Sequence, residues 1–243
     1  MNLGGILMGH HGFKCVKMLA TRSYILPCDG GYLLIDTTYK KDYEKFIKAL
    51  DRQGIKVSDI RYVLLTHHHD DHAGLVMELT GQCDARVIAH EKALEPLEKG
   101  ENELGETPNR RVKLVIALAK LSGGMTSFPP AVLRDEDLVV SGDDDHLLRN
   151  IGIDGKVLCT PGHTQDSVSI VLDDGNAFVG DLVSNAFRVA GTKHRPYFVD
   201  SMDDLLDSWR KILDEGSKTI YPVHGKPFPA ERLKYYLDRY KTS

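Results

Sequence analysis

Thr66-His67-His68-His69-Asp70-Asp71-His72 is the stretch that decides how the rest of this chain is interpreted. It contains the spacing His-x-His-x-Asp-His, so four side chains that can bind a metal stand within six residues. They are His67, His69, Asp71 and His72. Imidazole and carboxylate groups are the usual non-thiolate ligands of Zn²⁺. So dense a group of ligands predicts a metal site built partly from this loop.

The length and composition are those of a globular protein. The chain has 243 residues, a net charge of −4, 42% hydrophobic residues and 27% charged residues. Without an excess of Lys and Arg to neutralise phosphates, nucleic-acid binding is not expected. No apolar run approaches the ~18 residues of a membrane-spanning helix. The first residues lack the basic start and long apolar core of a signal peptide, so we expect a cytoplasmic protein that does not bind membranes.

Short apolar runs alternate with amphipathic runs along the whole chain. We expect strands at residues 31–35, 62–65, 85–89, 151–159, 167–172, 176–180 and 219–223. We expect helices at about 40–52, from 73 onward, and at 109–121, 202–214 and 229–241. The apolar residues of the helix at 40–52 recur at helical spacing, whereas those of the strand at 62–65 form a continuous buried run. Strands that alternate with helices indicate an α/β or mixed α+β fold.

Residues 91–130 are the part of the chain that fits this alternation least. We interpret residues 1–243 as a single domain with a helical insertion at about 91–130. The helix expected at 109–121 is apolar nearly all round, so the rest of the fold or a partner subunit should bury it. A homodimer and a lid formed by the same chain are equally consistent with this pattern.

Three single residues resemble the cluster in their placement after predicted strands. His163 follows the strand at 151–159 across a Thr-Pro-Gly turn, Asp181 follows residues 177–180, and His224 follows residues 220–223. Open sheet folds place their sites at the carboxyl ends of strands. A lone histidine is more often structural than a metal ligand, but the cluster reverses that expectation for His163 and His224.

At this point the chain resembles the metallo-β-lactamase superfamily. The matching pieces occur in the family's order over about residues 20–230. They are Asp36, Thr66 to His72, Thr160-Pro161-Gly162-His163-Thr164, Gly180-Asp181 and His224-Gly225. The resemblance implies a four-layer αββα sandwich, in which two sheets pack face to face between outer helices.

The resemblance also implies two metal ions. The first would be held by His67, His69 and His163. The second would be held by Asp71, His72 and His224, with Asp181 as a bridge between the ions. Two Zn²⁺ ions fit these ligands, and iron or manganese would also suit a site without cysteine.

Three further residues of the matching segments receive other roles. Asp36 resembles the family's carboxylate that orients a metal ligand, although it could equally cap the following helix. His68 and Asp70 should point away from the ions and serve structural roles.

The activity implied by the resemblance is hydrolysis by a hydroxide that bridges the two metals. The substrate would be a small molecule with an ester, thioester, lactone or amide bond, as in the glyoxalase II-like and lactonase-like branches. Asp71 is the candidate catalytic residue, while metal-bound water, Asp71 and His194 remain alternatives for protonating the leaving group. One alternative to hydrolysis is a persulfide dioxygenase, with a single iron bound by His67, by ligands on the side of His69, and by Asp181. The others are a phosphodiesterase and a ligand-sensing protein.

Two departures separate this chain from particular branches. Lactonases carry a Tyr three residues after the bridging Asp, where this chain has Ser184. Glyoxalase II enzymes continue into a helical domain, whereas 19 residues follow His224 here.

The segment from Ser184 to Asp200 is the candidate substrate loop. Ser184, Lys193, His194 and Arg195 would bind an anionic group of the substrate beside the metals. The alternative is a solvated loop with an aromatic anchor. The first interpretation predicts that Lys193→Ala or Arg195→Ala raises KM.

Overall fold

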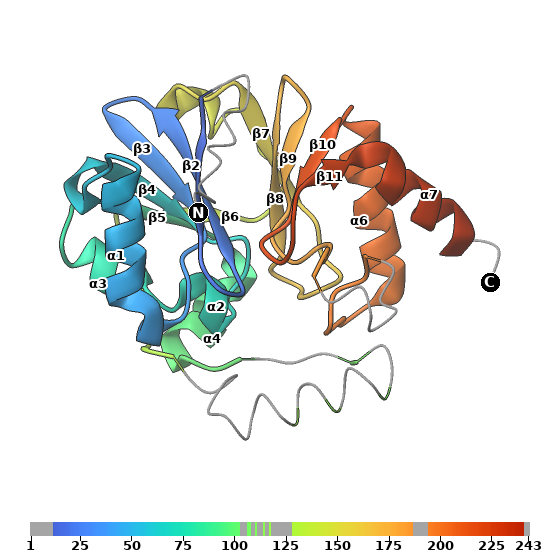
Figure 1. Cartoon of the computed structure of the whole chain (residues 1–243), viewed down its shortest axis with the longest axis horizontal. Coiled ribbons are helices and arrows are strands. Elements are labelled where there is room, and N and C mark those ends of the chain that lie inside the picture. The colour runs from blue at the N-terminus through green and yellow to red at the C-terminus, as the bar shows by residue number, and fades with distance from the viewer. Residues whose placement is uncertain are drawn as a thin grey trace, which may run out of the picture.

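A computed structural model describes residues 12–102, 106–107, 110, 114, 117, 128–186 and 194–240. In this part of the chain two β-sheets face each other and helices cover their outer sides (Figure 1). The first sheet follows the chain in the order β1 to β6, with strands Lys14–Lys17, Arg22–Cys28, Gly31–Ile35, Ile60–Leu64, Arg86–His90 and Leu138–Val140. The second has the order β11-β10-β9-β8-β7. Numbered from β7 to β11, its strands are Gly155–Cys159, Val168–Leu172, Asn176–Phe178, Thr219–Tyr221 and Phe228–Pro229.

The helices pack on the outer faces of the two sheets. On the first sheet they are α1 (Tyr43–Arg52), α2 (Asp70–Ala73), α3 (Val76–Thr80) and α4 (Leu94–Lys99). On the second sheet they are α6 (Met202–Asp214) and α7 (Ala230–Tyr240). Short 3₁₀ turns occur at Lys40–Asp42, Val57–Asp59, Glu91–Ala93 and Arg149–Ile151. The predicted αββα sandwich is therefore confirmed.

The core consists of three apolar layers that follow from the alternation of side chains along each strand. In β3, Leu33 and Ile35 point into the layer between the sheets, where they pack near Phe178 of β9. Leu34 points the other way, into the layer under α1. Both faces of β3 and β4 are buried toward their carboxyl ends, which explains why residues 31–35 and 62–65 appear in the sequence as continuous apolar runs.

Most predicted elements match the structure, and the differences have local causes. The helix expected from residue 73 is two short helices, α2 and α3, because the chain turns at Gly74 and Leu75 between them. The strand expected at 151–159 is shorter, since a 3₁₀ turn occupies Arg149–Ile151. The helix expected at 109–121 lies mainly outside the described residues. In the described part of the chain, no helix is long and apolar enough to cross a membrane.

The direction of the strands determines where the candidate ligands meet. β3 and β4 are parallel in the first sheet, and β9 and β10 are parallel in the second. β7 and β9 are each antiparallel to β8, so β7 runs in the same direction as β9. The turns that carry the candidate ligands follow these strands, and they therefore gather at one edge of the sandwich.

Candidate metal centre

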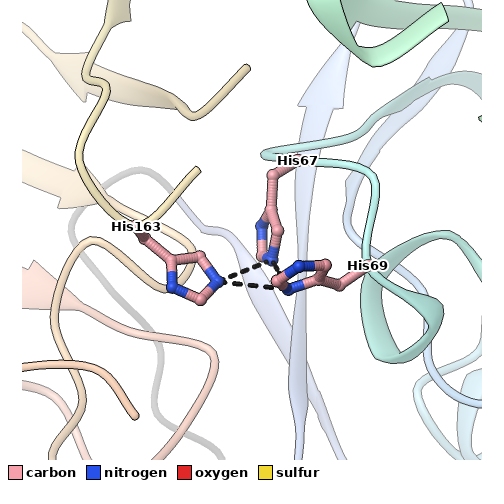
Figure 2. A group of neighbouring side chains, drawn as sticks. All are labelled: His67, His69 and His163. Carbon is pink, nitrogen blue, oxygen red and sulfur yellow. Dashed lines mark hydrogen bonds between the residues drawn. The ribbon is translucent and has the colours of Figure 1, made fainter. Parts of the chain in front are cut away.

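Three histidines from two different sheets converge on one point. Figure 2 shows the rings of His67, His69 and His163 pointing toward one another. His67 Nε2 lies 3.0 Å from His69 Nδ1, and His163 Nε2 lies 3.1 Å from His67 Nε2 and 3.2 Å from His69 Nδ1. Tetrahedral zinc with bonds of 2.0–2.1 Å to nitrogen places its ligands about 3.3 Å apart. The triangle of ring nitrogens therefore has the size of one face of a zinc coordination sphere.

A second group of donors lies beside the first. His224 Nε2 is 3.0 Å from Asp71 Oδ2, and His72 Nε2 is 3.7 Å from Asp71 Oδ1. Asp181 touches both groups. Its Oδ1 lies 3.6 Å from His72 Nε2, and its Oδ2 lies 3.3 Å from His224 Nε2 and 3.9 Å from His163 Nε2. All seven residues expected to bind metal are thus brought together.

Two buried atoms in this centre lack hydrogen-bond partners among the residues that the structure describes. They are His72 Nε2 and Asp181 Oδ1. Buried polar groups are rarely left unsatisfied, because each one has lost its hydrogen bonds to water, and this loss costs free energy. An ion between the two groups would satisfy both atoms, so the donors present fit a metal.

The ligand rings are held from outside by their second nitrogens. His163 Nδ1 donates to the carbonyl oxygen of Phe198 at 2.8 Å, and His224 Nδ1 donates to that of Ala20 at 2.9 Å. Each contact fixes the ring and makes Nε2 the nitrogen that faces the centre. Metal-binding histidines characteristically have such partners.

Asp36 connects the end of β3 to the histidine loop. Its carboxylate accepts hydrogen bonds from the Thr66 amide at 2.8 Å and the Thr66 hydroxyl at 2.7 Å. Its Oδ2 also lies 3.0 Å from His72 Nδ1. Of the two roles considered for Asp36, these contacts match the orienting role, and its carboxylate makes no helix-capping bond among the described residues. Its φ of 58° is unusual for a residue other than glycine, and such strain is concentrated at functional sites.

The two groups of donors differ in charge. Burial lowers the pKa of His67, and the neighbouring imidazoles lower it further, so this ring is neutral. Burial alone would also lower the pKa of His72, but the carboxylates of Asp36 and Asp71 outweigh it and raise that pKa to about 9. Burial raises the pKa of Asp181, yet His224 and His72 hold it at about 2. Without an ion, the second group therefore contains negative carboxylates and positive imidazoles whose charges offset one another.

Two glycines in the matching motifs are explained by close packing. Gly162, directly before His163, has a φ of 136°, and a side chain there would overlap Leu205 of α6. Gly180, directly before Asp181, has a φ of 50°, and a side chain would overlap Thr66. Only glycine meets both conditions without strain.

His68 is turned toward Asp166 and not toward the two donor groups, and Asp166 is a residue that the sequence did not single out. The amide of His68 donates to Asp166 Oδ2 at 2.9 Å, and His68 Nδ1 lies 3.0 Å from Asp166 Oδ1. Asp166 thus ties the histidine loop to the loop that carries His163. Its position three residues after His163 was the available signal. The backbone amide of Asp70 donates to Asn102 Oδ1 at 2.9 Å.

Tyr39 is a second residue that sequence reasoning missed. Its hydroxyl donates to Asp71 Oδ2 at 3.4 Å. Burial and the carboxylates of Asp71 and Asp70 raise its pKa, so the phenol keeps its proton. Tyr39 follows Asp36 by three residues, but only the fold brings it to Asp71.

The proposed substrate loop is described in part, because Lys193 lies outside the described residues. The amide of Ser184 donates to the carbonyl oxygen of His194, and the ring of His194 stacks on Phe228 at 4.3 Å. Arg195 is half-buried, and burial lowers its pKa against the influence of Tyr240 and Glu106. Their part in substrate binding stays a prediction.

The sequence profile described as the Metallo-beta-lactamase superfamily matches residues 19–224. This chain belongs to the metallo-β-lactamase superfamily. The matched range contains all seven residues of the two donor groups, so the predicted family is confirmed.

Individual relatives are distant and mostly longer. A hydroxyacylglutathione hydrolase of Rhodopseudomonas palustris (strain BisB5) is 31% identical over 170 residues, which are 65% of this chain and 51% of that protein. The atrochrysone carboxyl ACP thioesterase AacuM of Aspergillus aculeatus is 27% identical over 88% of this chain and 53% of its own length. The chain thus spans about half the length of these curated relatives.

A solved structure supports the fold. The metallo-β-lactamase MIM-1 from Novosphingobium pentaromativorans aligns with a TM-score of 0.68 at 17% identity. The alignment covers 98% of this chain and 86% of that one. At this identity the likeness extends to the fold alone.

Proposed function

We propose that this superfamily member is a metal-dependent hydrolase that cleaves small acyl compounds, with a thioester as the favoured substrate. The observation that carries the proposal is the pair of donor groups that share Asp181 and leave His72 Nε2 and Asp181 Oδ1 without partners. A site with two adjacent ions suits hydrolysis better than a purely structural role, because structural zinc sites are closed by four protein ligands.

Zinc is the proposed metal, with one ion on His67, His69 and His163 and the other on Asp71, His72 and His224. None of these ligands is cysteine, and neutral imidazole with carboxylate is a set that zinc favours. Ions bound there would lower the pKa of a water molecule and polarise the carbonyl group of the substrate.

Asp71 has a role beyond metal binding in this proposal. Burial raises the pKa of Asp71, but His72 and His224 lower it far more, so it remains a carboxylate. It is therefore suited to accept a hydrogen bond from the attacking water and orient it. Tyr39 holds the Oδ2 atom of the same carboxylate and fixes its direction.

The thioester preference rests on the names of two relatives. One is a hydroxyacylglutathione hydrolase and the other an ACP thioesterase, and both names denote an acyl group on a thiol. In the proposed reaction water adds to the acyl carbon, the carbon–sulfur bond breaks, and the products are a carboxylic acid and a thiol. A thiolate is a good leaving group, which reduces the need for a dedicated acid.

The test begins with metal content. The purified protein should contain two zinc ions per chain by mass spectrometry and should hydrolyse a simple acyl thioester faster than a lactone or a phosphodiester. Failure to bind added zinc, manganese or iron would refute the proposal. One iron per chain together with oxygen uptake on a persulfide would identify the dioxygenase instead, and a faster phosphodiester reaction would identify that alternative.

Asp181→Ala tests the bridge between the ions. The variant should fold normally by circular dichroism but retain only one metal per chain, because Asp181 contacts both donor groups. Two ions per chain in the variant would show that Asp181 is not a bridge.

A further inference from the structure

A basic groove lies outside the metal centre, between α1 and the turn that joins β1 to β2. It has a volume of about 260 Å³. Its lining includes four cationic side chains and three apolar ones, which are Lys17, Lys45, Lys48, Arg52, Met18, Leu19 and Ala49. Among the residues that the structure describes, no carboxylate lines it.

The charge of this groove is largely uncompensated. Lys45 pairs with Asp42 at 2.7 Å. Lys17, Lys48 and Arg52 form no ion pair with any residue that the structure describes. Lys45, Lys48 and Arg52 recur at intervals of three and four residues, so they form one exposed stripe on α1.

The register of the first hairpin adds another positive charge nearby. Lys17 of β1 lies directly opposite Arg22 of β2. Like charges at directly opposed positions destabilise a sheet. A bound anion would relieve this repulsion and that among the residues of the groove.

The groove is connected to the metal centre by the β1–β2 turn. Met18 and Leu19 line the groove, and the carbonyl oxygen of the next residue, Ala20, accepts the hydrogen bond from His224 Nδ1. Leu19 at this turn is fully exposed. A ligand that crosses the turn would therefore pass over an apolar side chain between the cations and the metal ligand His224.

We infer that this groove binds the phosphate-bearing thiol part of a thioester substrate, of the coenzyme A kind, while the acyl group lies at the metal centre. The inference rests on the proposed thioesterase function. Phosphate groups match an Arg together with several Lys residues. A glutathione thioester fits less well, because its ammonium group would meet a lining without carboxylates.

The double variant Lys48→Glu/Arg52→Glu tests the inference. Both residues are exposed on α1, so the fold should persist. The matched control is Arg232→Glu/Lys234→Glu, which makes the same charge change on α7, on the opposite side of the molecule (Figure 1). The measurement is the ratio of kcat/KM for an acyl-coenzyme A to kcat/KM for the uncharged S-acyl-N-acetylcysteamine.

We expect this ratio to fall at least tenfold in the groove variant and to stay within twofold in the control. An unchanged ratio in the groove variant would overturn the inference. So would an equal loss with S-acylglutathione, which would make the groove a general anion site. A loss confined to an acyl thioester of a carrier protein would overturn it in favour of a protein partner.

A binding measurement separates this inference from the proposed activity. Adenosine 3′,5′-bisphosphate, which has no acyl group, should bind the wild-type protein in a calorimetric titration and bind the groove variant at least tenfold more weakly. Equal binding by both proteins, or no binding by the wild type, would overturn the inference even if thioesters are hydrolysed. If no thioester is hydrolysed, the proposed function fails, and this titration still tests whether the groove binds a phosphate-bearing ligand.

Discussion

Three imidazoles of the centre, those of His72, His163 and His224, are positioned by atoms outside it, and so is the carboxylate of Asp71. Its Oδ2 is 3.0 Å from His224 Nε2 and accepts the hydrogen bond of Tyr39 at 3.4 Å. Partners of this kind orient metal ligands and commonly contribute 10–100-fold to metal affinity or activity. The residues that surround the ligands are therefore as much a part of the site as the ligands.

Tyr39→Phe should weaken the retention of one ion by about tenfold and leave the other unchanged, because the phenol contacts only the Asp71 side. A chelator competition titration, with zinc counted per chain, measures the effect. Tyr235→Phe is the control, since Tyr235 is half-exposed on α7 and lies beside Arg239. If the variant releases both ions at the same chelator concentrations as the wild-type protein, the prediction is contradicted.

At the scale of elements, two loops from different sheets are joined by one buried pair. Asp166, in the loop after β7, holds His68, in the loop after β4. Burial raises the pKa of Asp166, but its bonds with His68 lower it to about 2. Because this pKa lies below that of an unfolded Asp, near 3.9, the pair stabilises the fold above about pH 4. The contribution disappears as the pH falls through about 2.

Asp166→Asn should lower the free energy of unfolding of the metal-free protein by about 1.5–3 kcal/mol at pH 7, since it removes hydrogen bonds to a charged acceptor. The difference from wild type should shrink as the pH falls toward 2. Urea denaturation in the presence of a chelator at several pH values measures both effects. Asp173→Asn, which alters an exposed pair with Arg149, should change stability by less than about 1 kcal/mol. A loss independent of pH would argue against the ion pair.

Elements with strong patterns were predictable, and elements defined by distant contacts were not. The continuous apolar run of β3 and the amphipathic period of α6 matched their predicted bounds closely. The strands β1 and β6 have four and three residues, which is too short for a pattern that distinguishes them from loops. The convergence of the candidate ligands was predictable because they occupy strand ends in a recognisable order. Tyr39 and Asp166 were not, since only folding brings Tyr39 to Asp71, 32 residues away, and Asp166 to His68, 98 residues away.

At the scale of the whole molecule, imidazoles of the metal-free centre are protonated, and a metal ion must displace these protons. His72 has a pKa raised to about 9, and the pKa of His224 is raised as well by Asp181 and Asp71 against the effect of burial. The raised pKa of His72 stabilises the metal-free fold fully below about pH 6.5, and this contribution is lost as the pH rises through about 9. Both rings must lose the proton on Nε2 to bind a metal.

Zinc binding to the metal-free protein at pH 7 should therefore release on the order of two protons per chain. The apparent zinc affinity should rise with pH up to about 9, where His72 is half deprotonated. A pH-indicator dye in weak buffer measures the release, and the Asp181→Ala variant, which retains one ion, should release fewer. Zinc binding without proton release would contradict the assigned protonation of the centre.

The seven residues of the two donor groups are divided between two halves of the chain. The first sheet is formed entirely within residues 14–140 and the second entirely within residues 155–229, and each donor group takes ligands from both. Neither half alone could complete either donor group. Metal uptake would then be a late event in folding that occurs only after the halves have docked. The ions would hold the two sheets together at one edge of the sandwich. A chain deprived of metal should open first along that edge, where the candidate metal centre lies.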